Sequence, residues 1–421
     1  MRSTFAALRI RNYRLFATGS LVSNVGTWMQ RVAQDWLVLE LTASAGALGL
    51  TTGLQFLPIV LFSPFAGVIA DRYPKRRVLA LSQLAMGATA VLLGVLAVTG
   101  LVQPWHIYVL AFVFGSAAAF DMPARQAFVN EMVTREQMPN AIGLNSASFN
   151  LARMIGPALA GVIIAWMGSG VGATGWVILL NGVSYAAVIL SLTRMRASEL
   201  VPTEPLPRAK GQLRDGLRYV RARPDLMLVM AIVFCAGTFG LNFQMTTALM
   251  ATEVYGKGAG EYGVLGSILA VGSLAGSLLA ARRRESRQRR IVLAAVAFGA
   301  TVTAAGLMPS YLTFALILPL AGYTALTLIT SANAFVQMSA APQLRGRVMA
   351  LYMAIFMGGT PIGAPMLGLI AEHFGARWTL VGGGLLTAGG SLLATALLAR
   401  RQGVVLLAQL RTDRDERPAA A

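Results

Sequence analysis

Charged side chains are scarce in this sequence. Asp, Glu, Lys and Arg together make up 12% of its 421 residues, against about 25% in soluble globular proteins, while hydrophobic residues make up 56%. This composition excludes an ordinary soluble domain and predicts a chain that lies in a lipid bilayer.

Cysteine and histidine are scarcer still. The one cysteine, Cys235, lies in an apolar run and has no partner for an intramolecular disulfide. The two histidines belong to no group of His, Cys, Asp and Glu with the spacing of metal ligands, and the sequence shows no nucleophile–base constellation and no Walker motif. We therefore expect no metal, no other cofactor and no enzymatic activity.

Acidic residues number 17 against 35 basic ones, which gives a net charge of +18. The placement of the positive charges argues against a nucleic-acid partner. Of the 35 Lys and Arg, 31 fall in the termini or in alternate loops, two in the other loops and two within apolar runs. This is the positive-inside pattern. It predicts a multi-pass protein of the cytoplasmic (inner) membrane with both termini in the cytoplasm.

A helix needs about 20 mostly apolar residues to cross the hydrocarbon core of a bilayer. Twelve runs meet this length: 13–39, 46–70, 78–100, 104–124, 139–167, 172–193, 225–251, 259–281, 290–309, 311–335, 345–371 and 376–399. We predict an all-α membrane protein with twelve transmembrane helices.

One loop, residues 194–224, is much longer than the others, basic and rich in proline. Its Leu213, Leu217 and Val220 share one helical face, which predicts a short amphipathic helix on the inner leaflet. The chain then divides into four parts: a six-helix bundle over 1–193, the cytoplasmic linker over 194–224, a second six-helix bundle over 225–399 and a cytoplasmic tail over 400–421.

The two predicted bundles resemble each other at a constant offset of 207 residues. Ala-Phe-Val at 127–129 recurs at 334–336, and Gly156 recurs as Gly363. Parallel repeats of six helices are known from secondary transporters.

A charged turn, residues 67–77, connects the second and third runs. It follows the pattern Gly-x-x-x-Asp-Arg-x-Gly-basic-basic at Gly67, Asp71, Arg72, Lys75 and Arg76, with Pro74 in place of the second glycine. The pattern resembles the signature loop of the major facilitator superfamily. The resemblance implies two bundles that enclose a central cavity and alternate access by rocking, with this turn as a gating loop.

The first run carries polar residues on one helical face. Ser20, Asn24, Thr27, Arg31 and Asp35 follow one another at intervals of three or four. Because a charge within the bilayer is costly, this face is expected to turn toward a water-filled cavity. We interpret Asp35 as the proton carrier and Arg31, one turn away, as its partner. The alternative is an ion pair that only holds the helix in register.

Arg153 is the second cation inside an apolar run, and it precedes Gly156, Pro157 and Gly161. These three residues resemble part of the Gly-Pro motif in the fifth helix of antiporters of the superfamily. The resemblance favours export.

Asp121 and Arg125 lie one helical turn apart at the end of the fourth run. The surrounding segment resembles the branch of the superfamily that includes the enterobactin exporter and macrolide efflux proteins. In that setting the pair is expected to join Asp71 and the start of the eleventh run, near Arg345, in a charge network at the inner gate.

Polar side chains within the runs are candidates for the cavity wall or for helix–helix hydrogen bonds. They are Asn24, Gln34, Gln55, Asn145, Arg153, Asn181, Asn242, Gln244 and Asn333. Glycines spaced by four, at 49 and 53, 272 and 276, and 359 and 363, allow close helix contacts. Such contacts are expected either at the moving interface between the bundles or in static packing.

Together these features predict a monomeric secondary active transporter in the lipid bilayer. It would export a small amphiphilic molecule, such as a drug or a siderophore, in exchange for protons. Two alternatives stay open: uptake or lipid flipping on the same fold, and a membrane sensor or scaffold that transports nothing.

Overall fold

The structure is a computed structural model that describes residues 5–201, 212–281 and 288–401. Within these ranges the chain is helical and contains no β-strand. Two predictions fall outside them: the course of the linker over 202–211 and the cytoplasmic tail beyond residue 401.

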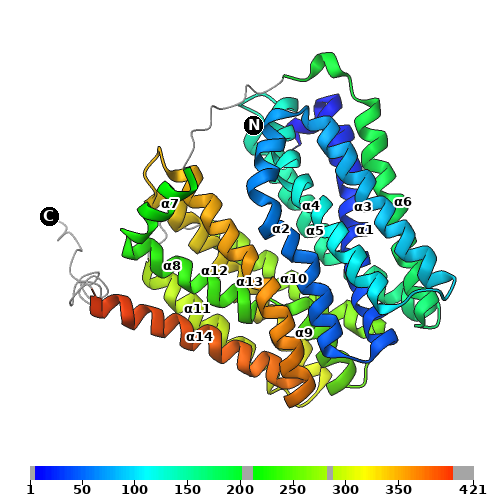
Figure 1. Ribbon diagram of the computed structural model, residues 1–421, viewed down its shortest axis with the longest axis vertical. Coiled ribbons are helices and arrows are strands. Elements are labelled where there is room, and N and C mark those ends of the chain that lie inside the picture. The colour runs from blue at the N-terminus through cyan, green and yellow to red at the C-terminus, as the bar shows by residue number, and fades with distance from the viewer. Residues whose placement is uncertain (1–4, 202–211, 282–287, 402–421) are drawn as a thin grey trace.

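Two groups of long helices lie side by side in Figure 1. The N-terminal bundle comprises α1 (Arg11–Thr42), α2 (Ala45–Arg72), α3 (Lys75–Val98), α4 (Pro104–Met132), α5 (Met138–Trp166) and α6 (Val171–Arg194). The C-terminal bundle begins with a segment in four pieces: α8 (Pro224–Cys235), η3 (Ala236–Gly240), α9 (Phe243–Leu249) and η4 (Met250–Val254). It continues with α10 (Ala259–Ala281), α11 (Gln288–Gly306), α12 (Tyr311–Ser339), α13 (Arg345–Phe374) and α14 (Ala376–Arg401).

The linker between the bundles contains the expected helix, α7 (Gln212–Arg221). Its Val220 is buried, and Asp215 forms an ion pair of 3.3 Å with Arg347 of α13. One side of α7 therefore packs on the C-terminal bundle, while Arg218 and Arg221 remain exposed. Its position on the inner leaflet stays a prediction.

The helices have the length and composition of membrane spans. Among the described residues, eleven segments are long and apolar enough to cross a bilayer. α1 is the twelfth long helix and falls outside that group because of its polar face, yet it packs against α2, α4, α5 and α6. A helix satisfies its backbone hydrogen bonds internally, as hydrocarbon surroundings require.

The fold repeats at the offset read from the sequence. α4 and α12 begin and end at positions that differ by 207, and α5 and α13 begin at such positions. Gly156 packs against Trp28 of α1, and its counterpart Gly363 packs against Thr238 of η3. The bundles are therefore pseudo-symmetric in packing as well as in sequence.

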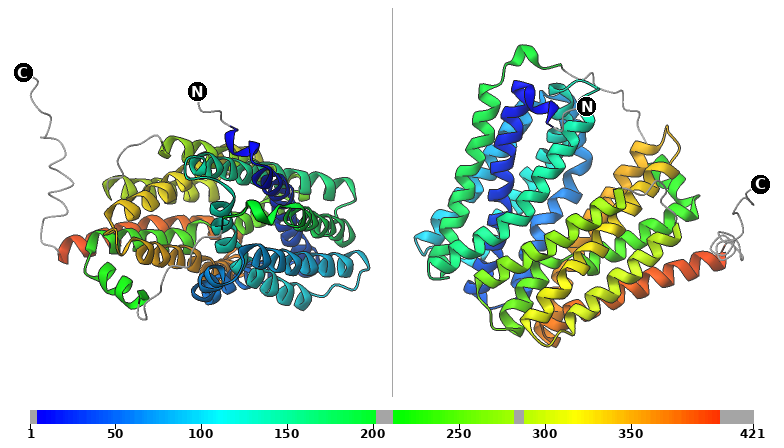
Figure 2. Two further views of the ribbon diagram at one scale, coloured as in Figure 1. Left: turned by 90° about the horizontal axis from the view of Figure 1, so that it is seen from above. Right: turned by 180° about the vertical axis from the view of Figure 1, so that it is seen from behind.

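Contacts between the bundles gather toward one end of the molecule. There Gly49 of α2 packs against Ala364 of α13, and Gly161 of α5 packs against Gly263 of α10. Toward the other end, which carries the N-terminus and α7, the bundles diverge (Figures 1 and 2). We call these two ends the closed end and the open end.

The seventh membrane segment differs from the continuous helix predicted over 225–251. Two π-helical stretches, η3 and η4, flank α9, and the helix is interrupted at Leu241 and Asn242. Gly237 and Gly240 lie in η3, and glycine destabilises a helix by about 1 kcal/mol relative to alanine. The interruption is buried within the protein, where irregular backbone is tolerated in a membrane.

Candidate functional site between the bundles

A hydrogen-bonded group connects the two bundles near the closed end. Oδ2 of Asp35, on α1, accepts a hydrogen bond from Nε2 of Gln244 at 2.7 Å and another from the hydroxyl of Tyr262 at 2.7 Å. Asp35 is only 4% exposed and Tyr262 only 1%, so bulk water competes little for these bonds. We call Asp35, Gln244 and Tyr262 the cross-bundle cluster.

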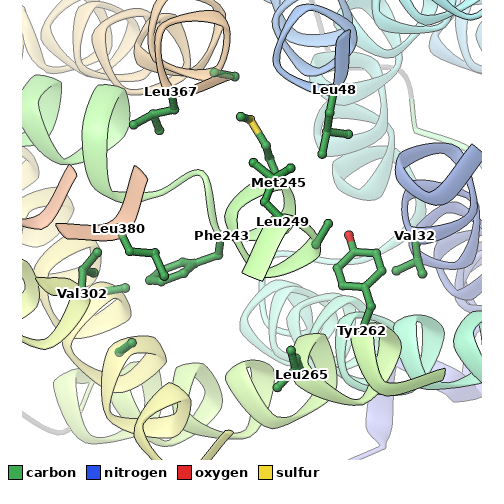
Figure 3. Packing of buried hydrophobic residues seen from close by; sticks show 14 of the residues in the cluster. Val32, Leu48, Phe243, Met245, Leu249, Tyr262, Leu265, Val302, Leu367 and Leu380 are labelled. Atoms are coloured by element: carbon green, nitrogen blue, oxygen red, sulfur yellow. The ribbon is translucent and has the colours of Figure 1, made fainter. Parts of the chain in front are cut away.

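Three different elements position this cluster. Asp35 lies on the polar face of α1, about two turns before the helix ends at the closed end. Gln244 follows the interruption of the seventh segment, and Tyr262 lies in the first turn of α10. Figure 3 shows the Tyr262 ring between Val32 of α1 and Leu249 of α9. The interrupted helix thus brings a side-chain amide to a carboxylate of the other bundle.

Arg31 does not form the expected ion pair with Asp35 in this conformation. Its guanidinium instead lies 4.7 Å from the ring centroid of Trp28 and 5.6 Å from that of Phe56. Its Nε atom is buried and has no hydrogen-bond partner. The spacing along the helix allows the pair, but in this conformation the guanidinium lies at the two aromatic rings, while Oδ2 of Asp35 accepts from two donors of the other bundle.

Arg153, on α5, also has guanidinium nitrogens that make no hydrogen bond. These are Nε and Nη2, which are both buried. Phe149 and Gly156, which share a helical face with it, both pack against Trp28. The two cations predicted inside apolar runs therefore belong to the same neighbourhood, around Trp28.

Two more polar links cross between the bundles. The Glu372 carboxylate of α13 accepts hydrogen bonds from the Ser44 hydroxyl and from the Gly46 N–H at 3.0 Å. These groups form the N-terminal end of α2, where a negative charge is stabilised. The Ser267 hydroxyl of α10 donates to the Met154 carbonyl of α5 at 2.5 Å. The closed end is therefore held by polar contacts as well as by close helix packing.

Asp121 and Arg125 form the expected pair, with Nε and Oδ2 2.9 Å apart. Their other partners lie in the N-terminal bundle: Gln83 donates to Asp121 at 2.7 Å, and Arg125 donates to Ser20 at 2.9 Å. Among the described residues, Asp121 and Arg125 therefore form no hydrogen bond or ion pair with the start of α13, from which the N-terminal bundle diverges toward the open end.

The charged turn between α2 and α3 lies at the open end. Gly67 and Arg72 belong to the last turns of α2, and Arg76 donates to the Thr193 carbonyl at 3.4 Å. Lys75 is 7% exposed and forms an ion pair of 2.9 Å with Glu131, at the end of α4. The Asp71 side chain lies outside the described part of the chain.

The remaining cavity candidates differ in the hydrogen bonds that their side chains form. Asn181 is fully buried in the N-terminal bundle and donates to Gln30 of α1 at 2.5 Å, so it serves as a helix–helix hydrogen bond. Asn242 donates to the Thr238 carbonyl, and Asn333 bonds within α12. The side chains of Asn24 and Asn145 are partly exposed and form no hydrogen bond within the described chain. Gln34 of α1 donates to Gln55 of α2 at 3.3 Å.

The three glycine pairs divide between the two alternatives. Gly49 and Gly53 of α2 face α13 of the other bundle. Gly272 and Gly276 face α12, while Gly359 and Gly363 face η3, all within the C-terminal bundle. Only the first of these three pairs lies at the interface between the bundles.

Pattern reasoning missed Tyr262, Glu372 and Ser44. Tyr262 is one tyrosine in an apolar run, and Glu372 is one acid at a helix end, so neither carries a periodic signal. Their contacts join residues more than 200 positions apart, which only the tertiary structure reveals.

Comparison with known proteins agrees with the fold. The family profile described as transmembrane secretion effector matches residues 2–410. The chain is 27% identical to the multidrug efflux pump Tap of Mycolicibacterium fortuitum, over 87% of this chain and 90% of that protein. It is 24% identical to the enterobactin exporter EntS of Escherichia coli O1:K1, over 96% and 94%, and 22% identical to macrolide efflux protein A of Streptococcus pyogenes, over 90% and 94%.

Solved structures show the same fold at low sequence identity. A bacterial homologue of the human lysosomal transporter Spinster, in an inward-facing and unoccupied conformation, superposes with a TM-score of 0.71 at 16% identity, covering 93% of this chain and 98% of that one. A D-xylose–proton symporter gives a TM-score of 0.71 at 11% identity, covering 90% and 97%. The chain belongs to the transmembrane secretion effector family of the major facilitator superfamily, and it is a multi-pass membrane transporter rather than an enzyme.

Proposed function

We propose that this transporter exports a small amphiphilic molecule in exchange for protons, with Asp35 as the proton carrier. The observation that carries the proposal is the cross-bundle cluster. A buried carboxylate on one bundle accepts two hydrogen bonds from the other bundle at the end where the bundles meet. The charge of Asp35 and the closure of that end are therefore linked.

The direction of the open end follows from the positive-inside pattern. Basic residues such as Arg14, Arg76 and Arg194 gather at the open end. We infer that the open end and both termini face the cytoplasm and that the closed end faces outward. The conformation described here is then the one that receives cargo from inside the cell.

Hydrogen bonds to a charged acceptor contribute about 1.5–3 kcal/mol, against about 1 kcal/mol for neutral pairs. Gln244 and Tyr262 therefore favour the ionised form of Asp35 while the outer end is closed. When the outer end opens, Asp35 loses both donors and takes up a proton from outside. Closing restores the donors and expels the proton inward. Each cycle moves a proton in and a cargo molecule out.

The guanidiniums of Arg31 and Arg153 each have buried nitrogen atoms without a hydrogen bond and lie in the neighbourhood of Trp28. They act on the charge of Asp35, or they meet an anionic group of the cargo. Trp28, Phe56 and Phe149 supply an aromatic surface beside them. The names of the relatives, efflux pumps and an exporter, support the outward direction.

Transport in proteoliposomes with an imposed pH gradient tests the proposal. The panel comprises fluorescent lipophilic cations, macrolides and catecholate siderophores, and the wild type is compared with Asp35→Asn. The exposed Glu199→Gln serves as a control of equal chemistry. Gradient-driven flux that is lost in Asp35→Asn and retained in Glu199→Gln is expected. Flux that survives in Asp35→Asn would place the proton elsewhere.

A further inference from the structure

A groove runs along the outer side of the N-terminal bundle, between α1 and α6. Its larger part has a volume of about 820 Å³ and is lined by apolar residues, among them Val22 and Met29 of α1 and Leu180 and Val183 of α6. A smaller part of about 230 Å³ continues it toward the open end and reaches Arg194. Both parts share Val22 and Leu190, so they form one continuous surface.

Glycines make the floor of this groove. At Gly19 and Gly26 of α1 an added methyl group would collide with Ser191 and with Ser184 of α6. The backbone of α1 at these glycines therefore lies directly against serine side chains of α6, and the larger residues of both helices form the walls of the groove. Val22 is 51% exposed and Leu190 48% exposed, so the apolar walls face outward, toward the surroundings of the bundle.

The length of the groove matches one leaflet of a bilayer. From Leu180 to Arg194 the α6 axis rises about 21 Å at 1.5 Å per residue. Half of a bilayer measures about 15 Å in its hydrocarbon core and about 20–22 Å when the headgroup region is included. The groove therefore extends from near the middle of the membrane to the polar surface at the open end.

Basic residues surround the open end of the groove. Arg11 donates to the Arg194 carbonyl at 3.1 Å, and Arg76 donates to the Thr193 carbonyl at 3.4 Å. Arg14 lies one turn from Thr18, which lines the groove, and is exposed. Within the described residues none of these four arginines forms an ion pair with an acid. The apolar groove thus ends among four arginines that form no ion pair in the described part of the chain.

We propose that this groove binds an anionic phospholipid of the cytoplasmic leaflet. One acyl chain lies in the groove over Gly19 and Gly26, and the phosphate group lies among Arg11, Arg14, Arg76 and Arg194. Basic pockets between membrane helices on the cytoplasmic side are suited to anionic headgroups. The proposal uses the orientation inferred above but does not depend on the cargo or on proton coupling.

Native mass spectrometry of the full-length protein tests this proposal. The purified protein is offered equal amounts of dioleoylphosphatidylglycerol and dioleoylphosphatidylcholine, and the retained lipids are counted. One basic residue strengthens binding to an anionic lipid surface about fivefold. We expect the wild type to prefer phosphatidylglycerol, and we expect this preference to fall about 25-fold in Arg14→Gln/Arg194→Gln. Arg218→Gln/Arg221→Gln on α7 removes the same charge elsewhere and is expected to retain it.

A second variant separates a lipid from a free phosphate. Val183→Trp fills the larger, apolar part of the groove about three helical turns from Arg194, so it is expected to weaken retention of phosphatidylglycerol. An excess of inorganic phosphate is expected not to displace the lipid. Equal retention of both lipids by the wild type, an unchanged affinity in Val183→Trp, or an equal loss in the α7 variant would each overturn the proposal. Thermal unfolding of every variant verifies that it is folded.

Discussion

At the scale of single residues, the hydroxyl of Tyr262 donates a hydrogen bond to Asp35 across the interface between the bundles. Removing its hydroxyl deletes one hydrogen bond between the bundles, a bond of about 1.5–3 kcal/mol when the acceptor is charged. Tyr262→Phe is therefore expected to increase the population in which the bundles are separated at the closed end. Spin labels at Leu101 and Leu307, both exposed at the closed end, report the opening as a longer distance.

The chain offers a matched control for this change. The hydroxyl of Tyr255 donates to the Met308 carbonyl at 2.9 Å, within the C-terminal bundle. Tyr255→Phe removes a similar bond that does not cross between the bundles. The same label distance in both variants would contradict the role given to Tyr262. The single native cysteine is replaced by Cys235→Ala before labelling.

The ion pair between Lys75 and Glu131 is expected to stabilise the fold. Both side chains are more than 90% buried, and breaking a buried pair costs about 3–5 kcal/mol because one charge is left alone. Lys75→Met should lower the thermal unfolding temperature in detergent by several degrees. Arg196→Met breaks an exposed pair with Glu199, where the loss is at most about 1 kcal/mol. Similar losses in the two variants would show that the buried pair has no special effect.

The sequence alone identifies Asp35 as a candidate but does not predict which residues donate hydrogen bonds to it. A polar face on α1 within an apolar chain is a local pattern, and it singled out Asp35 and Arg31. Gln244 was among the cavity candidates, but nothing local assigned it to Asp35. The expected ion pair is absent because spacing along a helix only states which side chains are in reach. The place of Arg31 at the Trp28 and Phe56 rings, and the hydrogen bonds from Gln244 and Tyr262 to Asp35, are set by the tertiary structure.

At the scale of elements, glycine pairs with the same spacing lie at different kinds of helix contact, one between the bundles and one within a bundle. A methyl group at Gly49 of α2 would collide with the Ala364 carbonyl of α13, across the interface. A methyl group at Gly272 of α10 would collide with the Pro319 carbonyl of α12, inside one bundle. The first collision can be relieved by movement of one bundle against the other, and the second cannot.

Gly49→Ala is therefore expected to lengthen the distance between labels at Leu101 and Leu307 with little loss of thermal stability. Gly272→Ala is expected to lower the unfolding temperature and leave that distance unchanged. The comparison combines the label distance with thermal unfolding of the same samples. A loss of stability in Gly49→Ala with an unchanged distance would contradict the assignment of Gly49 to the moving interface.

Helix positions followed from apolar length, and the two-bundle repeat followed from the offset of 207 residues. The interruption of the seventh segment did not, because an apolar run with two glycines reads equally well as a continuous helix. The same offset relates Asp35 to Asn242 and Arg31 to Thr238. The charged pair therefore exists in one bundle only, and its counterpart is the irregular stretch that supplies Gln244.

At the scale of the whole molecule, we propose that the two pseudo-symmetric bundles move against each other and that the cross-bundle cluster couples this movement to protons. Glu372 and Ser267 add polar contacts across the same end. These two links do not depend on the charge of Asp35. Among these contacts, the pH dependence of closure should therefore arise from Asp35. Glu372 is a second carboxylate at the closed end and is exposed. A parallel sample with Glu372→Gln therefore separates its titration from that of Asp35.

The distance between labels at Leu101 and Leu307, measured in acidic and in alkaline buffer, tests the central claim most directly. In the wild type, acid should lengthen the distance because a protonated Asp35 holds Gln244 and Tyr262 less strongly. Asp35→Asn should show the longer distance at both pH values, and Glu372→Gln should keep the response of the wild type. A distance in Asp35→Asn that still responds to pH as the wild type does would contradict the link between Asp35 and the contact of the two bundles at the closed end.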